Sequence, residues 1–257
     1  MITRLRPLAL AAAFACMGSA QAEQFNVLVF SKTAGWHHES IHAGVTAIQE
    51  LGKLHDFGVF WTEDPNRVMN DKELAKYKAV VFLMTTGDVL NAEQQGAFER
   101  YIRAGGGFVG VHSASDTEYG WPWYTRMVGH MFHVHPAVQS ATIKVENRNF
   151  PGMERFAKRF LATEEWYEFG PAQSRDLKYL LSVDESTYKP QTKWNGQKEG
   201  KGMGAFHPIS WYQDYDNGRA FYTALGHLPA TWRESAFTHH LYGGIYWAAT
   251  GATFRAE

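Results

Sequence analysis

A histidine occupies the centre of a motif that usually presents a catalytic nucleophile. Gly110-Val-His-Ser-Ala114 follows an apolar run and has the small-x-nucleophile-x-small pattern of a tight strand-to-helix turn. Its central residue, His112, can act as a general base, a general acid or a metal ligand. Ser113 is one residue past the apex and is a weaker serine-hydrolase candidate. The alternative is that His112 only forms hydrogen bonds within the turn.

Several other histidines could join His112 in a metal site. His133 and His135 are two residues apart and would share one face of a strand, while His207 and His227 each stand near the end of an apolar run. A catalytic metal centre needs three converging ligands and one open position, which scattered polar or buried histidines would not provide. Two alternatives stay open: no cofactor, or a divalent metal ion. The predicted ligands of that ion are His112, His135, His207 and His227.

Carboxylates are frequent near these segments, and a pair of them could perform glycosidic acid–base chemistry. Asp116 follows the His112 turn, and Glu165 follows Glu164 in a later segment. The sequence does not give their separation, and a single carboxylate is more often a surface or capping residue. The predicted catalytic residues are His112, Asp116, His207 and Glu165.

The elements that would position these residues alternate between strands and helices in the first half of the chain. Continuous apolar runs predict buried strands, and Asn91 with Gln94 three residues later predicts the capped start of a helix. This alternation predicts an α/β fold with a parallel sheet covered by helices on both faces, and a doubly wound half over residues 25–130. The predicted strands are residues 25–30, 57–61, 78–84 and 108–111, and a helix is predicted from Glu39.

Polar loops follow three of these strands, over residues 32–39, 85–88 and 110–116. In open parallel sheets, ligands bind at the carboxyl ends of the strands. Three polar loops at strand ends therefore predict a site at this edge of the sheet.

The second half of the chain is less regular. Strands are predicted at residues 141–146, 177–183, 203–209 and 219–225, with Asp216-Asn-Gly218 as the turn between the last two. A closing helix is predicted over residues 237–250, with His239 and His240 facing solvent near its start. We expect a single domain over residues 23–257 with an elaborated second half, and two domains stay open as the alternative.

The first 22 residues have the layout of a secretory signal peptide. Arg4 and Arg6 precede an apolar run over residues 8–17, and Ala20-Gln-Ala22 is a small-x-small cleavage site. We expect an exported protein, periplasmic or secreted, with a lipoprotein acylated at Cys16 as the alternative. No later segment approaches the roughly 20 apolar residues that span a bilayer.

Cleavage would also remove Cys16, the only cysteine in the sequence. Its loss excludes a cysteine nucleophile, a zinc–thiolate site, an iron–sulfur cluster and a disulfide. The cleaved chain would carry a net charge of −3, since it loses two of the 25 basic residues and none of the 26 acidic ones. A mildly acidic chain of this kind is not expected to bind nucleic acid or an anionic membrane.

Ordered motifs along the chain resemble the trehalose-utilisation (ThuA-like) family. Two of them are Ser31-Lys-Thr-Ala-Gly-Trp-His-His-Glu-Ser40 and Gly105-Gly-Gly-Phe-Val-Gly-Val-His-Ser-Ala114. The resemblance runs from about Asn26 to Ala249. Its other motifs are residues 85–91, 116–124, 164–169, 184–188, 207–209 and 218–227.

The resemblance implies a flavodoxin-like fold of the class I glutamine amidotransferase type. In the amidotransferases the elbow residue is a cysteine, backed by a downstream histidine and an acid. Here that residue is His112, so glutamine hydrolysis by a thiol is excluded. The family is linked to sugar metabolism, including disaccharides oxidised to 3-keto forms. Of the pair His37 and His38, the second is favoured as the site residue.

We therefore expect an enzyme that acts on a small carbohydrate, namely a disaccharide, a glycoside or a 3-keto sugar, as a hydrolase, lyase or isomerase. The alternatives are a metal-dependent hydrolase and a non-catalytic carbohydrate-binding protein. In the binding protein, Trp36, Trp121, Trp123 and Trp166 would stack on sugar rings. The oligomeric state is left open. The predicted substrate-binding residues are Trp36, His38, Asp88, Ser113, Trp121 and Tyr167.

Overall fold

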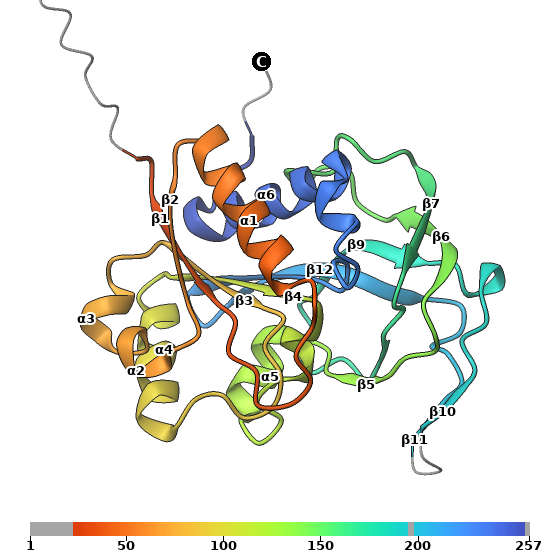
Figure 1. Ribbon diagram of the computed structural model, residues 1–257, viewed down its shortest axis with the longest axis horizontal. Coiled ribbons are helices and arrows are strands. Elements are labelled where there is room, and N and C mark those ends of the chain that lie inside the picture. The colour runs from red at the N-terminus through yellow and green to blue at the C-terminus, as the bar shows by residue number, and fades with distance from the viewer. Residues whose placement is uncertain (1–22, 195–197, 255–257) are drawn as a thin grey trace, which may run out of the picture.

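The computed structural model describes residues 23–194 and 198–254, which fold around a nine-stranded mixed sheet (Figure 1). The predicted signal peptide lies outside the described residues. In spatial order the strands are β2 (Gly58–Thr62), β1 (Asn26–Phe30), β3 (Ala79–Leu83), β4 (Gly107–Val111), β13 (Gly218–Thr223), β12 (His207–Tyr215), β9 (Lys178–Val183), β6 (Gln139–Val145) and β7 (Arg159–Glu164).

The first five strands in this order are parallel, and the other four pair in antiparallel fashion. Their order, with β13 as the fifth strand, is the flavodoxin-like order 2-1-3-4-5. Strand β13 comes from the second half of the chain and pairs with β4. The parallel sheet predicted from the first half is therefore completed by a strand that follows more than a hundred residues later.

Helices cover both faces of the sheet, as predicted (Figure 1). Helices α1 (Ile41–Leu54) and α6 (Ser235–Thr250) lie on one face. The other face carries α4 (Ala92–Arg103) and α5 (Pro122–Val128), with the short helices α2 (Pro65–Val68) and α3 (Asp71–Leu74) beside α4. Strands β3 and β4 are buried at every residue, which explains their continuous apolar sequences. Within the described residues, no helix has the length and apolar character that crossing a membrane requires.

Smaller elements complete the fold. Two short antiparallel pairs lie beside the main sheet, β5 (Phe132–Val134) with β8 (Glu168–Phe169) and β10 (Thr192–Trp194) with β11 (Lys198–Gly200). Three turns of 3-10 helix are η1 (His112–Asp116), η2 (Glu185–Thr187) and η3 (Thr231–Arg233).

The start of α4 confirms the predicted capping box. The Asn91 side-chain oxygen accepts a hydrogen bond from the Gln94 amide at 3.0 Å, and the Gln94 side-chain oxygen accepts one from the Asn91 amide at 3.0 Å. Two amide donors at the helix start, which lack partners within the helix, are thereby satisfied, and this fixes where the helix begins.

The strand predicted at residues 203–209 is wrong in its bounds, because β12 starts at His207 and continues to Tyr215. Gly202 and Gly204 adopt φ angles of +85° and +83°, so the chain is not extended before His207. The predicted turn does join β12 to β13: Asp216 and Asn217 both have positive φ, at +48° and +69°, as a two-residue hairpin loop requires.

The prediction that His240 faces solvent is also wrong. His240 is fully buried on α6, between the rings of Phe156 and Phe221. The Ser210 hydroxyl donates to the Tyr222 carbonyl, so it accepts from His240 Nε2–H at 3.1 Å. Among the described residues, His240 Nδ1 has no hydrogen-bond partner. Burial, followed by the nearby His239, lowers the pKa of His240 to about 3.

We predict that His240 makes the fold less stable in mild acid. Because an unfolded histidine titrates near pH 6.5, the unfolded chain gains a proton between about pH 6.5 and 3 that the folded chain does not accept. Stability from the neutral ring is complete above pH 6.5 and falls by up to about 1.4 kcal/mol per pH unit below it. In urea unfolding, the wild type should lose about 2 kcal/mol of unfolding free energy between pH 7.5 and pH 5 through His240, and His240→Leu should not show this loss. Parallel pH curves for the two proteins would contradict this assignment.

Candidate metal and substrate site

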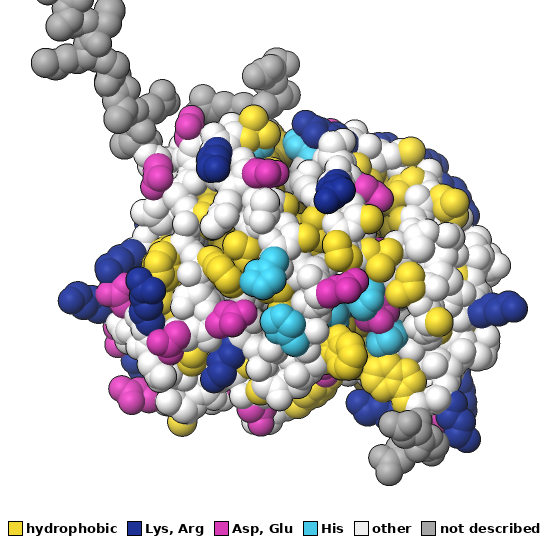
Figure 2. Space-filling view, viewed as in Figure 1, with side chains coloured by type: hydrophobic (Ala, Val, Ile, Leu, Met, Phe, Trp, Pro, Cys, Tyr) yellow, Lys and Arg dark blue, Asp and Glu magenta, His cyan; other side chains and the backbone are white. Residues whose placement is uncertain are grey.

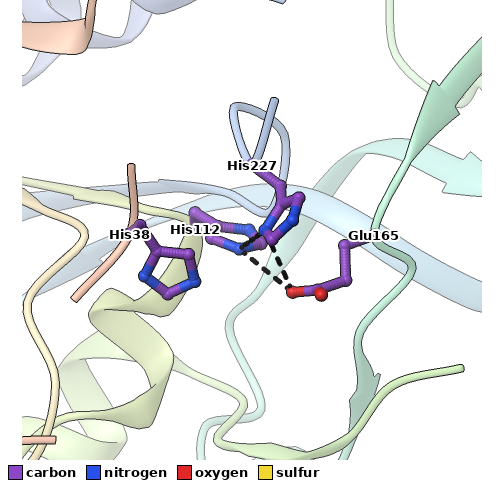
Figure 3. Close-up of side chains that lie close together, drawn as sticks. All are labelled: His38, His112, Glu165 and His227. Atoms are coloured by element: carbon purple, nitrogen blue, oxygen red, sulfur yellow. Dashed lines mark hydrogen bonds and ion pairs between the residues drawn. The ribbon is translucent and has the colours of Figure 1, made fainter. Parts of the chain in front are cut away.

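Four side chains from distant segments meet at the carboxyl ends of the parallel strands (Figure 3). His38 lies between β1 and α1, His112 follows β4, Glu165 follows β7, and His227 follows β13. Each offers one ligand atom, and the four atoms all lie within 4.8 Å of one another. His38, His112 and Glu165 are buried, while His227 is partly exposed. We call these four residues the His3Glu cluster.

Three atoms of the cluster form a small triangle. His112 Nε2 lies 3.2 Å from His227 Nδ1 and 3.4 Å from Glu165 Oε2. His227 Nδ1 and Glu165 Oε2 are 3.2 Å apart. Tetrahedral metal–ligand bonds of about 2.0–2.1 Å place neighbouring ligand atoms about 3.3 Å apart. The triangle therefore has the dimensions of one face of a metal coordination tetrahedron.

The His112 elbow is held by the strand beside it. His112 has φ +51°, in the left-handed region, and begins η1 instead of the α-helix that the motif suggested. Its Nδ1–H donates to the Ala224 carbonyl at 2.8 Å, which leaves the lone pair of the neutral ring on Nε2. The Tyr222 hydroxyl donates to the His112 carbonyl at 2.6 Å. Both contacts come from β13 or its end, so the pairing of β13 with β4 aims His112 Nε2 into the cluster.

His38 is positioned by a loop that is fixed to the end of β3. The Ala34 amide donates to the Thr86 carbonyl at 2.7 Å, and the Thr86 hydroxyl donates to the Trp36 carbonyl at 2.9 Å. His38 Nδ1 lies 3.3 Å from the hydroxyl oxygen of Ser113. Burial, followed by the neighbouring His112 and His227, lowers the pKa of His38 to about 2. His38 is therefore neutral at physiological pH, the form that binds metals.

Glu165 interacts with three histidines. Its Oε2 contacts His112 and His227, and its Oε1 lies 3.1 Å from His135 Nδ1. Burial raises the pKa of the Glu165 carboxyl, but the neighbouring His112 and His227 side chains outweigh it and hold that pKa well below its usual range. Burial lowers the pKa of His227, and the hydrogen bond with Glu165 more than reverses this, so that the pKa is raised.

The cluster opens into a cavity of about 490 Å³. Its walls are mainly aromatic, and Trp36 at its edge is 73% exposed. On the surface, histidine side chains gather near the middle of one face, beside acidic and hydrophobic side chains (Figure 2). A cavity of this size is in the range that holds small ligands. The lining residues are Trp36, His38, Asp116, Phe132, His135, Glu165, Tyr167, Trp194 and His227.

Most of the site residues predicted from the sequence come together here. Of the predicted metal ligands, His112 and His227 belong to the cluster, and His135 lies beside it, in contact with Glu165 and the cavity. Of the predicted substrate-binding residues, Trp36, His38 and Tyr167 line the cavity. Asp116 also lines it and accepts a hydrogen bond from the Tyr119 hydroxyl at 2.7 Å. Burial raises the pKa of the Asp116 carboxyl.

Other predicted residues lie elsewhere. His207 is buried with its Nε2 donating to the Tyr167 carbonyl at 2.7 Å and its Nδ1 2.7 Å from Glu185, so both ring nitrogens are engaged outside the cluster. Ser113 is buried behind His38. Asp88 is exposed in a separate shallow hollow with Lys32.

Of the four tryptophans predicted to stack on sugar rings, some lie away from the cavity. Trp121, Trp123 and Trp166 are buried, and Trp121 stacks on Trp123 at 5.3 Å between ring centroids. Only Trp36 of that set lines the cavity.

Two aromatic residues of the cavity were not predicted from the sequence. Phe132 and Trp194 come from the two small antiparallel pairs, and the Trp194 indole donates to the His135 carbonyl at 3.0 Å. Neither stands in a recognisable motif. Glu165 and His38 were predicted as site residues, but not as metal ligands.

The comparisons with known proteins agree with this fold. A family profile described as ThuA, trehalose utilisation, matches residues 26–248. The chain belongs to the ThuA family. Membership of this family gives the protein a role in carbohydrate metabolism. A search of curated proteins finds no match.

Solved structures similar to this ThuA family member include two ThuA-like proteins. That from Bacteroides uniformis has a TM-score of 0.73 at 22% identity over 95% of this chain and 98% of its own. That from Parabacteroides merdae has a TM-score of 0.69 at 21% identity, over 91% and 92%. A glutamine amidotransferase from Thermotoga maritima has a TM-score of 0.50 at 10% identity, over 89% and 99%. These likenesses confirm the predicted amidotransferase-like fold.

The left-handed elbow gives a test that is independent of ligand binding. We predict that His112→Val is at least about 1 kcal/mol less stable than His112→Asn in urea unfolding, because a β-branched residue is strained at positive φ whereas asparagine tolerates it. Both variants remove the imidazole, and because position 112 is fully buried, burial by itself favours valine over asparagine. A less stable valine variant therefore reports the strain of the backbone, and a more stable one would contradict this prediction.

Proposed function

We propose that this ThuA family member is a metal-dependent enzyme acting on a small carbohydrate, with the His3Glu cluster as its metal centre. The triangle of ligand atoms from His112, Glu165 and His227, with sides of 3.2–3.4 Å, carries this proposal. Two histidines and a glutamate form the ligand set of several catalytic zinc sites. His38 would be a fourth ligand or would contact a metal-bound substrate.

The donor set fits a divalent transition metal such as zinc, manganese or iron. Imidazole nitrogens and a carboxylate oxygen suit these ions, and the hydrogen bond from His112 Nδ1 to Ala224 is the outer contact that orients a ligand histidine. When bound, the ion would supply a Lewis acid that polarises a carbonyl or hydroxyl oxygen of the substrate.

The residues around the cluster would handle the substrate. Asp116 faces the cavity with a raised carboxyl pKa and is our candidate general acid. His135 faces the same cavity, with Nδ1 oriented by Glu165 and the Pro136 carbonyl. The aromatic walls offer flat apolar faces for sugar rings and exclude water from the reacting groups. Disaccharides, glycosides and 3-keto sugars are the substrates we propose, with hydrolysis, elimination or isomerisation as the reaction.

We also propose that the protein is exported to the periplasm or secreted. The motif over residues 1–22 supports this, and those residues lie outside the described part of the chain.

A non-catalytic carbohydrate-binding protein is the second candidate function, and the aromatic lining of the cavity favours it. It shares the sugar site but predicts saturable binding without product. Calorimetry and product analysis on one sample distinguish the two functions.

Our first test of the metal centre is elemental analysis of tag-free protein. We expect about one equivalent of zinc, manganese or iron per chain. In buffered zinc titrations, His112→Ala, His227→Ala and Glu165→Gln should each weaken binding by about 100-fold or more, because each removes a ligand atom.

His37→Ala is the matched control for that titration, because His37 neighbours His38 on the same loop but is exposed and lies outside the cluster. It should leave zinc affinity unchanged. Less than about half an equivalent of metal, with no zinc binding on titration, would refute the metal centre.

The aromatic wall gives a separate test of sugar binding. Trp36→Ala should weaken trehalose binding in calorimetry by about tenfold, the factor that corresponds to about 1.4 kcal/mol of lost ring contact. Phe206→Ala is the control, since Phe206 is 43% exposed but lies outside the cavity. Equal losses in both variants would argue against Trp36 as a sugar platform.

A further inference from the structure

Two consecutive glutamates hold His227 from opposite sides. The Glu165 carboxylate lies 3.2 Å from the side-chain Nδ1 of His227, and the Glu164 carboxylate accepts a hydrogen bond from the backbone amide of His227 at 3.2 Å. Glu164 is the last residue of β7 and Glu165 follows it; the Glu165 carboxylate lies in the cluster, and the Glu164 carboxylate lies against the loop that begins at Gly226.

The Glu164 carboxylate is an unusual group to bury. It is only 1% exposed, and its other donors are the Gly226 amide at 3.0 Å, the Thr231 hydroxyl at 2.6 Å and, at 3.4 Å, the Glu165 amide. A buried carboxylate is costly unless such donors replace its water. Three of the four donors belong to residues 226–231, so the carboxylate closes this loop into one turn.

The loop is shaped to receive that carboxylate. Gly226 has φ +109°, and a Cβ there would lie 3.1 Å from Trp232, so neither its backbone nor its surroundings favour a side chain. The Trp232 indole donates to the Gly226 carbonyl at 2.9 Å. The consecutive amides of Gly226 and His227 point to the same carboxylate, an arrangement typical of anion-binding nests.

We infer that Glu164 is a positioning residue for the metal centre: it holds the loop that presents His227 as a ligand. The inference rests on the proposed metal centre. Glu164 would also place a negative charge directly behind a ligand histidine, which offsets part of the positive charge of a divalent ion. If so, replacing Glu164 should weaken metal binding only when His227 is present. A general contribution to folding would not depend on His227.

A double-mutant cycle tests this route. Zinc affinity is measured by chelator-buffered titration of the full-length protein for wild type, Glu164→Gln, His227→Ala and the double variant. We expect Glu164→Gln alone to weaken zinc binding by about 10- to 100-fold, since one of its oxygens becomes an amide group that faces N–H donors. In the His227→Ala background the same change should alter affinity less than about threefold.

Two further variants separate positioning from stability. Thr231→Val removes one donor to Glu164 and keeps the charge, and it should weaken zinc binding by about threefold or more even if Glu164→Gln folds poorly. Glu118→Gln is the matched control, because Glu118 is a 2% exposed carboxylate that accepts backbone amides of Val89 and Leu90, away from the cluster. It should lower the melting temperature without changing zinc affinity.

Each outcome decides the inference. Equal effects of Glu164→Gln with and without His227, or an unchanged affinity in both Glu164→Gln and Thr231→Val, would overturn the positioning role and leave the metal centre standing. A wild type that binds no zinc, manganese or iron would overturn the proposed metal centre and this inference together.

Discussion

The parallel pairing of β13 with β4 is the constraint on which the site depends. Thr223 lies opposite Val111 in this pair, so the two strands end side by side. That register places the Ala224 carbonyl against His112 Nδ1, and it starts the His227 loop beside the His112 elbow. A slip of the register would remove the acceptor that orients His112 and would separate two of the four cluster residues.

Electrostatic interactions then decide the protonation states of the buried groups. Three imidazoles gathered in a desolvated space would repel one another if protonated, and His38 accordingly stays neutral. Glu165 stays ionised because two histidines outweigh its burial. An ionised carboxylate beside a neutral imidazole matches the protonation states that metal ligands need.

Much of the fold could be predicted because its signals are local. Apolar runs marked β1, β3 and β4, and the capping box at Asn91 marked α4. Strand β12 was misplaced because its outer half alternates buried and exposed residues, and its start depends on two glycines with positive φ. The pairing of β4 with β13 could not be predicted, because nothing local in residues 218–223 indicates which distant strand they pair with.

The site was predictable only in part, for the same reason. His112 was found from its motif, and His38 from the family resemblance. His207 and His227 were both predicted as metal ligands from their places near apolar runs, yet one donates to the Tyr167 carbonyl and the other joins the cluster. Glu164 and Glu165 are neighbours in sequence, yet one contacts the His227 amide and the other the His227 side chain. These different roles depend on where distant segments meet in the fold. Residue type and spacing along the sequence do not determine that.

The four cluster residues are separated by roughly 50 to 75 residues at each step along the chain. An ion bound to all of them would close three long loops, as a set of cross-links does, and would restrict the unfolded chain accordingly. The only cysteine of this sequence is Cys16, so disulfides cannot supply such cross-links. Coordination would therefore link the parallel half of the sheet to its antiparallel half. The stability of the folded chain would then depend on the concentration of the free metal ion.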